Sequence, residues 1–175
     1  MSDLARAWSI RLAQPEDADA IHQIDAECLE TGHATFRDTP HDWPSFAAAF
    51  ESGLALVLVE ADVVQGWAAV ARSSARAVYR GVGETSVYVS PQAHGRGVGT
   101  RLLQTLIERA EDAGFWTLTA QIFPENAASL ALHQRQGFDI LGRRRALGRM
   151  TYGPEQGKWR DVMFLERRSP YIGQD

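Results

Sequence analysis

Hydrophobic positions in the second half of the chain switch between strand and helix spacing. Residues 98–110 carry apolar side chains at helical intervals, and Gly114 is expected to end this helix; the apolar residues are Val98, Leu102, Leu103, Leu106, Ile107 and Ala110. β-rich runs precede the helix at 84–90 (ETSVYVS) and follow it at 116–123 (WTLTAQIF). A second helix is expected over 126–137, with an Asn N-cap, followed by strands at 138–144 and 157–167. This order predicts an α/β layer with some parallel strand pairing.

The first half of the chain predicts strands joined by a tight turn. The run LALVLVEADVVQGWAAVAR at 54–72 holds two β-rich segments around a polar turn at 60–62, which is typical of an antiparallel hairpin. A short strand at 10–12 precedes a helix that begins at Pro15, in a segment rich in acidic residues, and ends near residue 30. A shorter helix is expected at 44–51. We expect one domain over residues 9–168, with flexible termini at 1–8 and 169–175.

Length and composition exclude several classes of protein. A chain of 175 residues with 45% hydrophobic content fits one globular domain. Its formal net charge of −4 gives no broad positive field, so we expect neither nucleic acid nor a membrane surface as a partner. No run approaches the roughly 18 apolar residues of a membrane span, and no signal-peptide core is present. The single cysteine, Cys28, fits a reducing, cytoplasmic compartment, and its helical position favours core filling over a reactive thiol.

Three glycines stand at the entrance of the helix that starts near residue 98, in the segment HGRGVG at 94–99. A helix start has unpaired backbone N–H groups and a partial positive charge, and glycines remove the side chains that would keep an anion away. The alternative is a tight turn without a ligand, but glycine costs up to about 1 kcal/mol in a helix relative to alanine. The pattern therefore favours a phosphate, most readily a pyrophosphate. No Gly-Lys-Ser/Thr follows, and the spacing is a poor dinucleotide fingerprint.

Two motifs in matching order resemble those of the GNAT acetyltransferases: HGRGVG at 94–99 and NAASLALHQRQGF at 126–138. Within that family the chain is most similar to the phosphinothricin, arsinothricin and methionine-sulfoximine amino-acid N-acetyltransferases. This closer resemblance lies in ETGHATFRDTP at 30–40, ARAVYRGVGETSVYVS at 75–90, IFPENAASLALH at 122–133 and GKWRDV at 157–162, and it covers roughly residues 10–166. His94 stands where the family usually has Gln or Arg. His133 stands where many members have a tyrosine acid, although the phosphinothricin group is similar in having histidine there.

The resemblance implies a fold and a co-substrate. The expected fold is α/β, of the α+β GNAT type, with a single mixed central sheet of six or seven strands flanked by helices and a splayed strand pair that holds the acyl-CoA arm. Acetyl-CoA is the implied co-substrate. Its pantetheine arm would lie along the strand residues 87–89, and the Val89 N–H would donate to the acetyl carbonyl. Its pyrophosphate would bind the backbone amides of residues 95–100. The implied cofactor-binding residues are Val87, Tyr88, Val89, His94, Gly95, Arg96, Gly97, Val98, Gly99, Thr100, Asn126 and Ser129.

The acceptor side is also implied by the resemblance. Glu84 would remove the proton of the acceptor's ammonium group, directly or through water, and the alternative is an exposed strand glutamate. His133 is left with three roles: general acid, hydrogen-bond donor to the substrate, or helix histidine satisfied within the fold. Arg76 and Tyr79 match family positions for binding an acidic acceptor, Phe36 would line the pocket, and the alternative for Arg76 is an ordinary hairpin charge.

The sequence thus predicts an enzyme that moves an acetyl group from acetyl-CoA to the α-amino group of a small amino acid, such as phosphinothricin, arsinothricin or methionine sulfoximine or sulfone. Another acceptor, a polyamine or a protein N-terminus, and a non-catalytic acyl-CoA-binding regulator are the alternatives. A homodimer is implied by the family, and no metal is expected because no histidine has a suitable partner spacing. Trp159 and Asp161 receive no chemical role, and the run 143–145 of arginines is interpreted as a solvated face rather than an anion-attracting one.

Overall fold

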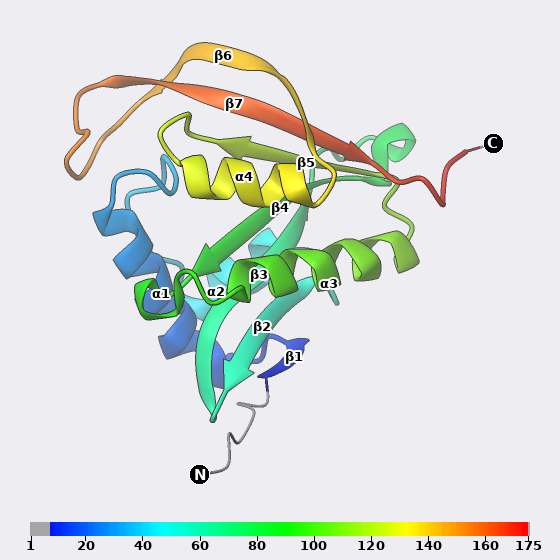
Figure 1. Cartoon of the computed structure of the whole chain (residues 1–175), viewed down its shortest axis with the longest axis horizontal. Helices are drawn as coiled ribbons and strands as arrows, with labels where there is room; N and C mark the ends of the chain where they lie inside the picture. The colour runs from blue at the N-terminus through cyan, green and yellow to red at the C-terminus, as the bar shows by residue number, and fades with distance from the viewer. Residues whose placement is uncertain (1–7, 175) are drawn as a thin grey trace.

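The computed structural model describes residues 8–174, and within them one seven-stranded sheet is flanked by helices (Figure 1). The strands are β1 (Trp8–Leu12), β2 (Ala55–Glu60), β3 (Val63–Arg72), β4 (Val82–Val89), β5 (Thr117–Ile122), β6 (Asp139–Arg149) and β7 (Trp159–Arg168). The helices are α1 (Ala18–Glu30), α2 (Trp43–Ala49), α3 (Val98–Asp112) and α4 (Ala127–Arg135), with 3-10 helices η1 (Pro15–Asp17), η2 (Ala77–Tyr79) and η3 (Pro91–Ala93).

The sheet is mixed, as predicted. Its strand order is β1-β2-β3-β4-β5-β7-β6, and every neighbouring pair is antiparallel except β4 and β5, which run parallel. The parallel pair is joined through α3, as a crossover between parallel strands requires. The predicted fold class is therefore confirmed.

Strands β4 and β5 form a fork. Their paired residues span only Val82–Glu84 on β4 and Thr117–Thr119 on β5. At the point of divergence the Thr85 hydroxyl donates to the Thr119 carbonyl at 3.2 Å, and the Thr119 hydroxyl donates to the Gly83 carbonyl at the same distance. These side-chain bonds complete the ladder where the backbones separate, because a buried carbonyl without a partner would be costly.

Beyond the point of divergence, every second residue of β4 directs its backbone N–H and C=O toward the gap between β4 and β5. The register follows from the Ser90 N–H, which donates to the carbonyl of Gln65 in β3, because hydrogen bonds in an antiparallel ladder recur at every second pair. Tyr88 therefore directs its backbone toward β3, whereas Val87 and Val89 direct theirs toward the gap. The sequence grouped all three residues with the co-substrate. The Tyr88 ring is stacked 4.5 Å from the Trp67 ring, and the role of Tyr88 toward the co-substrate stays a prediction.

The two faces of the sheet carry separate cores. Helix α3 packs on β2, β3 and β4 and contacts α4 on the same face, in a core with Leu102, Leu106 and Leu165 (Figure 1). Helix α1 packs on β3 and β4 from the other face, where the core includes Phe46 of α2 and Trp67 of β3. The glycine loop thus opens at the end of the sheet where β4 leads into α3. No helix among residues 8–174 is long and apolar enough to cross a membrane.

Several predicted boundaries shift at the sheet margins. Strand β1 starts at Trp8, which was counted with the flexible N-terminus; the rest of that segment, residues 1–7, lies outside the described residues. Strand β6 continues to Arg149, so the arginine run lies within an exposed strand. The C-terminal segment is anchored where it begins, because Ser169 is buried and its N–H donates to the Trp116 carbonyl at 2.8 Å.

Cys28 lies in α1 and is partly buried, with its Sγ atom 3.6 Å from the Val89 carbonyl oxygen. Burial, with a smaller contribution from the Asp25 carboxylate, raises the pKa of this thiol to about 11. The thiol is then protonated below that pH, so at pH 8 about one molecule in a thousand carries the reactive thiolate. We expect a disulfide reagent at pH 8 to label the native protein about 100-fold more slowly than the urea-unfolded chain. Equal rates would contradict this placement.

Candidate active site

The glycine loop between η3 and α3 leaves the first turn of α3 open. Gly95 and Gly97 have φ of +73° and +86°, and a Cβ atom at either would have no neighbour within 4 Å. Gly97 is the N-cap, no side chain caps the helix, and the turn's first helical bond runs from Arg101 N–H to the Gly97 carbonyl. The N–H groups before Arg101 therefore lack a helical acceptor, and the loop fits a ligand that brings phosphate oxygens close to the main chain.

Side chains of the loop hold it in place. The Arg96 Nη2 atom lies 2.7 and 2.6 Å from the two carboxylate oxygens of Glu60, and the Trp8 indole N–H donates to the same carboxylate at 2.8 Å. His94 Nε2 donates to the Val89 carbonyl at 3.1 Å. The side chains of Arg96 and His94 thus brace the turn.

A chain of hydrogen bonds extends from Glu84, which lies at the base of the fork. Gln121 of β5 donates from Nε2 to Glu84 Oε2 at 2.7 Å, and its Oε1 accepts from Arg144 Nη1 of β6 at 3.2 Å. The sequence predicted Glu84 but missed Gln121 and Arg144. One signal was available, because Gln121 is the exposed residue of an otherwise buried strand.

Phe36 lies in the loop after α1. Its ring meets the Phe123 ring edge-on at 4.9 Å. A Cβ atom at Gly148 of β6 would lie 2.8 Å from the Phe36 ring, so only glycine leaves room for it. Phe36 therefore belongs to a small apolar cluster with Phe123 and Val162, which is consistent with a pocket wall.

A buried carboxylate anchors that loop to the rest of the fold. Asp25 of α1 is fully buried and accepts from Trp67 Nε1 at 3.0 Å, His41 Nδ1 at 2.7 Å and Arg37 Nη2 at 2.8 Å. Two of these donors come from the loop after α1 and the third comes from β3, so the network fixes the position of the loop relative to α1 and β3.

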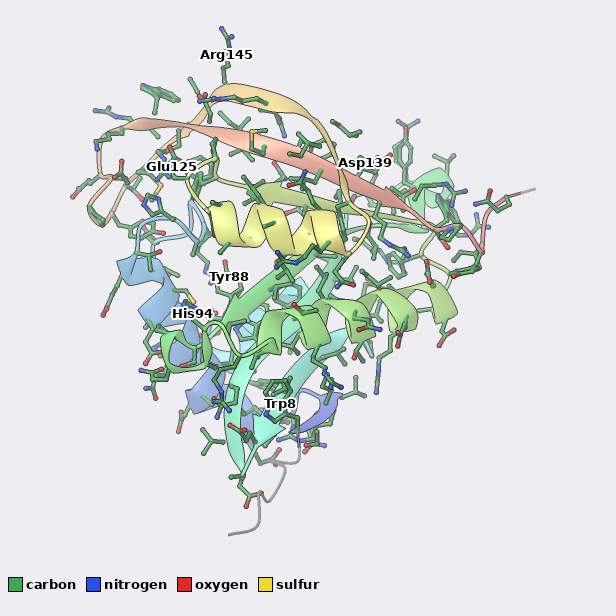
Figure 2. The ribbon with its side chains drawn as sticks, viewed as in Figure 1. Trp8, Tyr88, His94, Glu125, Asp139 and Arg145 are labelled. Atoms are coloured by element: carbon green, nitrogen blue, oxygen red, sulfur yellow. The ribbon has the colours of Figure 1, made fainter. Side chains whose placement is uncertain are left out.

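Arg160 of β7 is a second anchor, which the sequence analysis did not identify. Its buried guanidinium donates to the Gly32 carbonyl at 2.8 Å and to Glu125 at 3.0 Å, approaches His33 Nδ1 at 3.0 Å, and lies 4.1 Å from the centre of the Phe123 ring. Figure 2 shows Glu125 beside the start of α4, close to this loop.

The residues flanking Arg160 are unlike it. Trp159 is 64% exposed, whereas Asp161 accepts from Arg143 at 2.6 Å and from the Ala146 N–H at 2.7 Å. Asp161 thus has a structural role in the β6–β7 hairpin, and Trp159 is available at the surface.

Arg76 and Tyr79 lie in the exposed connection between β3 and β4. The guanidinium lies 5.6 Å from the centre of the Tyr79 ring, so the structure brings these two residues together. It shows no contact from either to Glu84 or Phe36, so their role toward the acceptor stays a prediction.

Helix α4 carries the remaining predicted residues. Asn126 is its N-cap: its Oδ1 accepts from Ser129 N–H at 3.1 Å, and its Nδ2 donates to the His33 carbonyl at 3.3 Å.

His133 is buried, and its Nδ1 donates to the Ser129 carbonyl at 2.9 Å. Burial lowers the pKa of His133, so the ring is neutral near pH 7 and its Nε2 holds a lone pair. Among the described residues this Nε2 is the one buried side-chain nitrogen or oxygen without a partner. The arrangement favours the structural role over the general acid.

Among residues 8–174 no group of three or more histidine, cysteine or carboxylate side chains is placed to hold a metal ion. The fork itself presents open main-chain amides, the Glu84 carboxylate and the polar groups beside it.

Known proteins are similar to this chain in sequence and in fold. The sequence pattern of the acetyltransferase (GNAT) family matches residues 18–138. The phosphinothricin N-acetyltransferase of Alcaligenes faecalis is 34% identical over 94% of this chain and 85% of its own length. The L-methionine sulfoximine/L-methionine sulfone acetyltransferase of Pseudomonas aeruginosa PAO1 is 34% identical over 90% of this chain and 92% of its own.

A solved structure agrees with these sequence matches. The crystal structure of a phosphinothricin acetyltransferase from Sinorhizobium meliloti in complex with AcCoA superposes with a TM-score of 0.81 at 31% identity, over 92% of this chain and 88% of that one. The fold with its β4–β5 fork, the open glycine turn and the extent of the family match lead to one conclusion: the chain is a member of the acetyltransferase (GNAT) family.

Proposed function

We propose that this protein transfers an acetyl group from acetyl-CoA to the α-amino group of a small amino acid. One observation carries the proposal: strand β4 holds Glu84 where β5 diverges, and then leads past Val87 and Val89 into the open glycine turn. A base and an anion site thus stand on one continuous segment. The relatives named for phosphinothricin and methionine sulfoximine support the acceptor class.

The glycine turn would hold the diphosphate of acetyl-CoA, which supplies the activated acetyl group when bound. N–H groups of residues 97–100 are the donors, and Gly95 and Gly97 leave room for the approach. Val87 and Val89 would bind the pantetheine arm through backbone groups, as an added strand is bound at a sheet edge. The Val89 N–H would donate to the acetyl carbonyl and stabilise negative charge on it during attack.

Glu84 would act as the general base. An α-ammonium group has no lone pair, so it must lose a proton before it attacks the carbonyl carbon. Gln121 donates to one oxygen of Glu84 and leaves the other oxygen to receive that proton. Asn126 and Ser129 lie at the start of the helix beside the fork and would contact acetyl-CoA, whereas His133 would keep a structural role through its bond to the Ser129 carbonyl.

Phe36 would line the acceptor pocket, with Arg76 and Tyr79 as further candidates to bind an acidic group. A homodimer is also part of this proposal. Apolar side chains exposed on the β6–β7 hairpin support it; they are Ile140, Leu141, Leu147 and Trp159.

An acceptor panel tests the proposed function. Purified protein is mixed with acetyl-CoA and, separately, with phosphinothricin, methionine sulfone, spermidine and a peptide with a free N-terminal alanine, and release of the CoA thiol is followed. We expect release with the two amino acids and at least tenfold less with the other two acceptors. Release with spermidine or the peptide alone would favour the alternative acceptors, and tight acetyl-CoA binding without any release would favour a regulator.

A further inference from the structure

Three polar side chains from three different strands form one connected row: Glu84 of β4, Gln121 of β5 and Arg144 of β6. The two bonds measure 2.7 and 3.2 Å. Strand β7 lies between β5 and β6 in the sheet, so the Arg144 side chain reaches across β7 to meet Gln121. Backbone pairing of neighbouring strands therefore does not by itself bring the three residues together, and the row depends on these particular side chains.

The chemistry of its ends fixes the orientation of the Gln121 amide. A carboxylate only accepts hydrogen bonds, and a guanidinium only donates them. Nε2 of Gln121 must then face Glu84, and Oε1 must face Arg144, as the structure shows. The amide thus presents a nitrogen donor to the base and an oxygen acceptor to the cation.

Arg144 differs from the other arginines of β6. Arg143 is neutralised by Asp161 at 2.6 Å, and Arg149 donates to the Gly157 carbonyl at 2.9 Å. Arg145 projects from β6 into solvent (Figure 2). Within the described part of the chain no carboxylate forms an ion pair with Arg144, whose guanidinium keeps further N–H groups for a ligand.

We propose that Arg144 binds the α-carboxylate of the acceptor and that Gln121 is a positioning residue that holds Glu84 and Arg144 in register. The inference rests on the proposed function. An α-amino acid has the same polarity as the Gln121 amide, with a nitrogen donor at one end and oxygen acceptors at the other. It can therefore lie along the row with its ammonium at Glu84 and its carboxylate at Arg144. The apolar cluster of Phe36, Phe123 and Val162 lies beside the row, since Val162 pairs with Arg144.

Two acceptors that differ only in the carboxylate test the role of Arg144. These are methionine sulfone and 3-(methylsulfonyl)propylamine. We expect Arg144→Gln to lower kcat/KM for the amino acid about tenfold, as befits one lost charge-assisted contact, and to change the value for the amine less than about twofold. If the wild type does not turn over the amine, its inhibition constant against methionine sulfone replaces kcat/KM. The matched control, Arg145→Gln, removes the same charge one residue away and should change neither acceptor.

Equal losses for both acceptors, or no loss with Arg144→Gln, would overturn the inference. If the wild type acetylates neither compound nor any amine of the panel, the proposed function itself fails, which is a distinguishable result.

For Gln121, the variant Gln121→Met keeps the length of the side chain but removes both hydrogen bonds. We expect it to lower kcat about tenfold for both acceptors with KM for acetyl-CoA unchanged, because a displaced base reacts poorly. An unchanged kcat would remove Gln121 from the proposal.

Discussion

Replacing Glu84 by glutamine should lower kcat by about 100- to 10,000-fold while acetyl-CoA still binds, because a positioned base contributes rate enhancement of that size. The substitution is nearly isosteric, and its amide oxygen can still accept from Gln121. What it removes is the capacity to take a proton from the acceptor's ammonium group. Steady-state thiol release at saturating acceptor measures kcat, and calorimetric titration measures acetyl-CoA affinity.

A matched variant separates this effect from a general loss of charge. Glu108 lies on the exposed side of α3, where its carboxylate accepts from Gln104 at 3.3 Å. Glu108→Gln should therefore keep wild-type activity. Full activity of Glu84→Gln across the pH range would show that another group takes the proton.

Replacing Gly97 by alanine should raise the KM for acetyl-CoA about 100-fold, through loss of charge-assisted hydrogen bonds worth roughly 1.5–3 kcal/mol each. The new methyl group would enter the open space in front of the α3 amides, where the diphosphate is expected. The measurement is KM for acetyl-CoA at saturating acceptor, together with the unfolding midpoint in urea.

Gly114 offers the control for this substitution at the other end of α3. Its φ is +88°, against +86° for Gly97, and a Cβ atom there also has no neighbour within 4 Å. Both alanine variants should lose similar stability, about 1–2 kcal/mol, because both place a side chain in the left-handed region. Only Gly97→Ala should affect acetyl-CoA. Similar KM values for the two variants would mean that the turn is a structural feature and not the anion site.

Local signals in the sequence were sufficient to predict the helices and the loop that form the glycine turn and its surroundings. The periodic apolar residues of α3, the glycines before it and the Asn126 N-cap of α4 each act within a few residues, so their structures could be predicted. The fork could not be predicted from such local signals, since the point at which β5 leaves β4 depends on two Thr hydroxyls that form hydrogen bonds across the strands. It was expected from the family resemblance and not from the periodicity.

The residues that were missed act over long sequence separations. Gln121 meets Glu84 across 37 positions, and Arg160 meets Gly32 across 128. Arg160 stands in a polar stretch next to exposed Trp159, so nothing in the alternation of β7 indicates that its guanidinium is buried. The register that directs the Tyr88 backbone toward β3 is likewise a property of strand pairing, which local sequence does not reveal.

Whether the glycine turn binds the diphosphate of acetyl-CoA can be seen in a crystal structure of the protein soaked with acetyl-CoA. We expect diphosphate oxygens within hydrogen-bonding distance of backbone N–H groups in residues 97–100, and the pantetheine arm between β4 and β5 beside Val87 and Val89. Acetyl-CoA bound elsewhere, with side chains filling the space in front of the glycine turn, would contradict it.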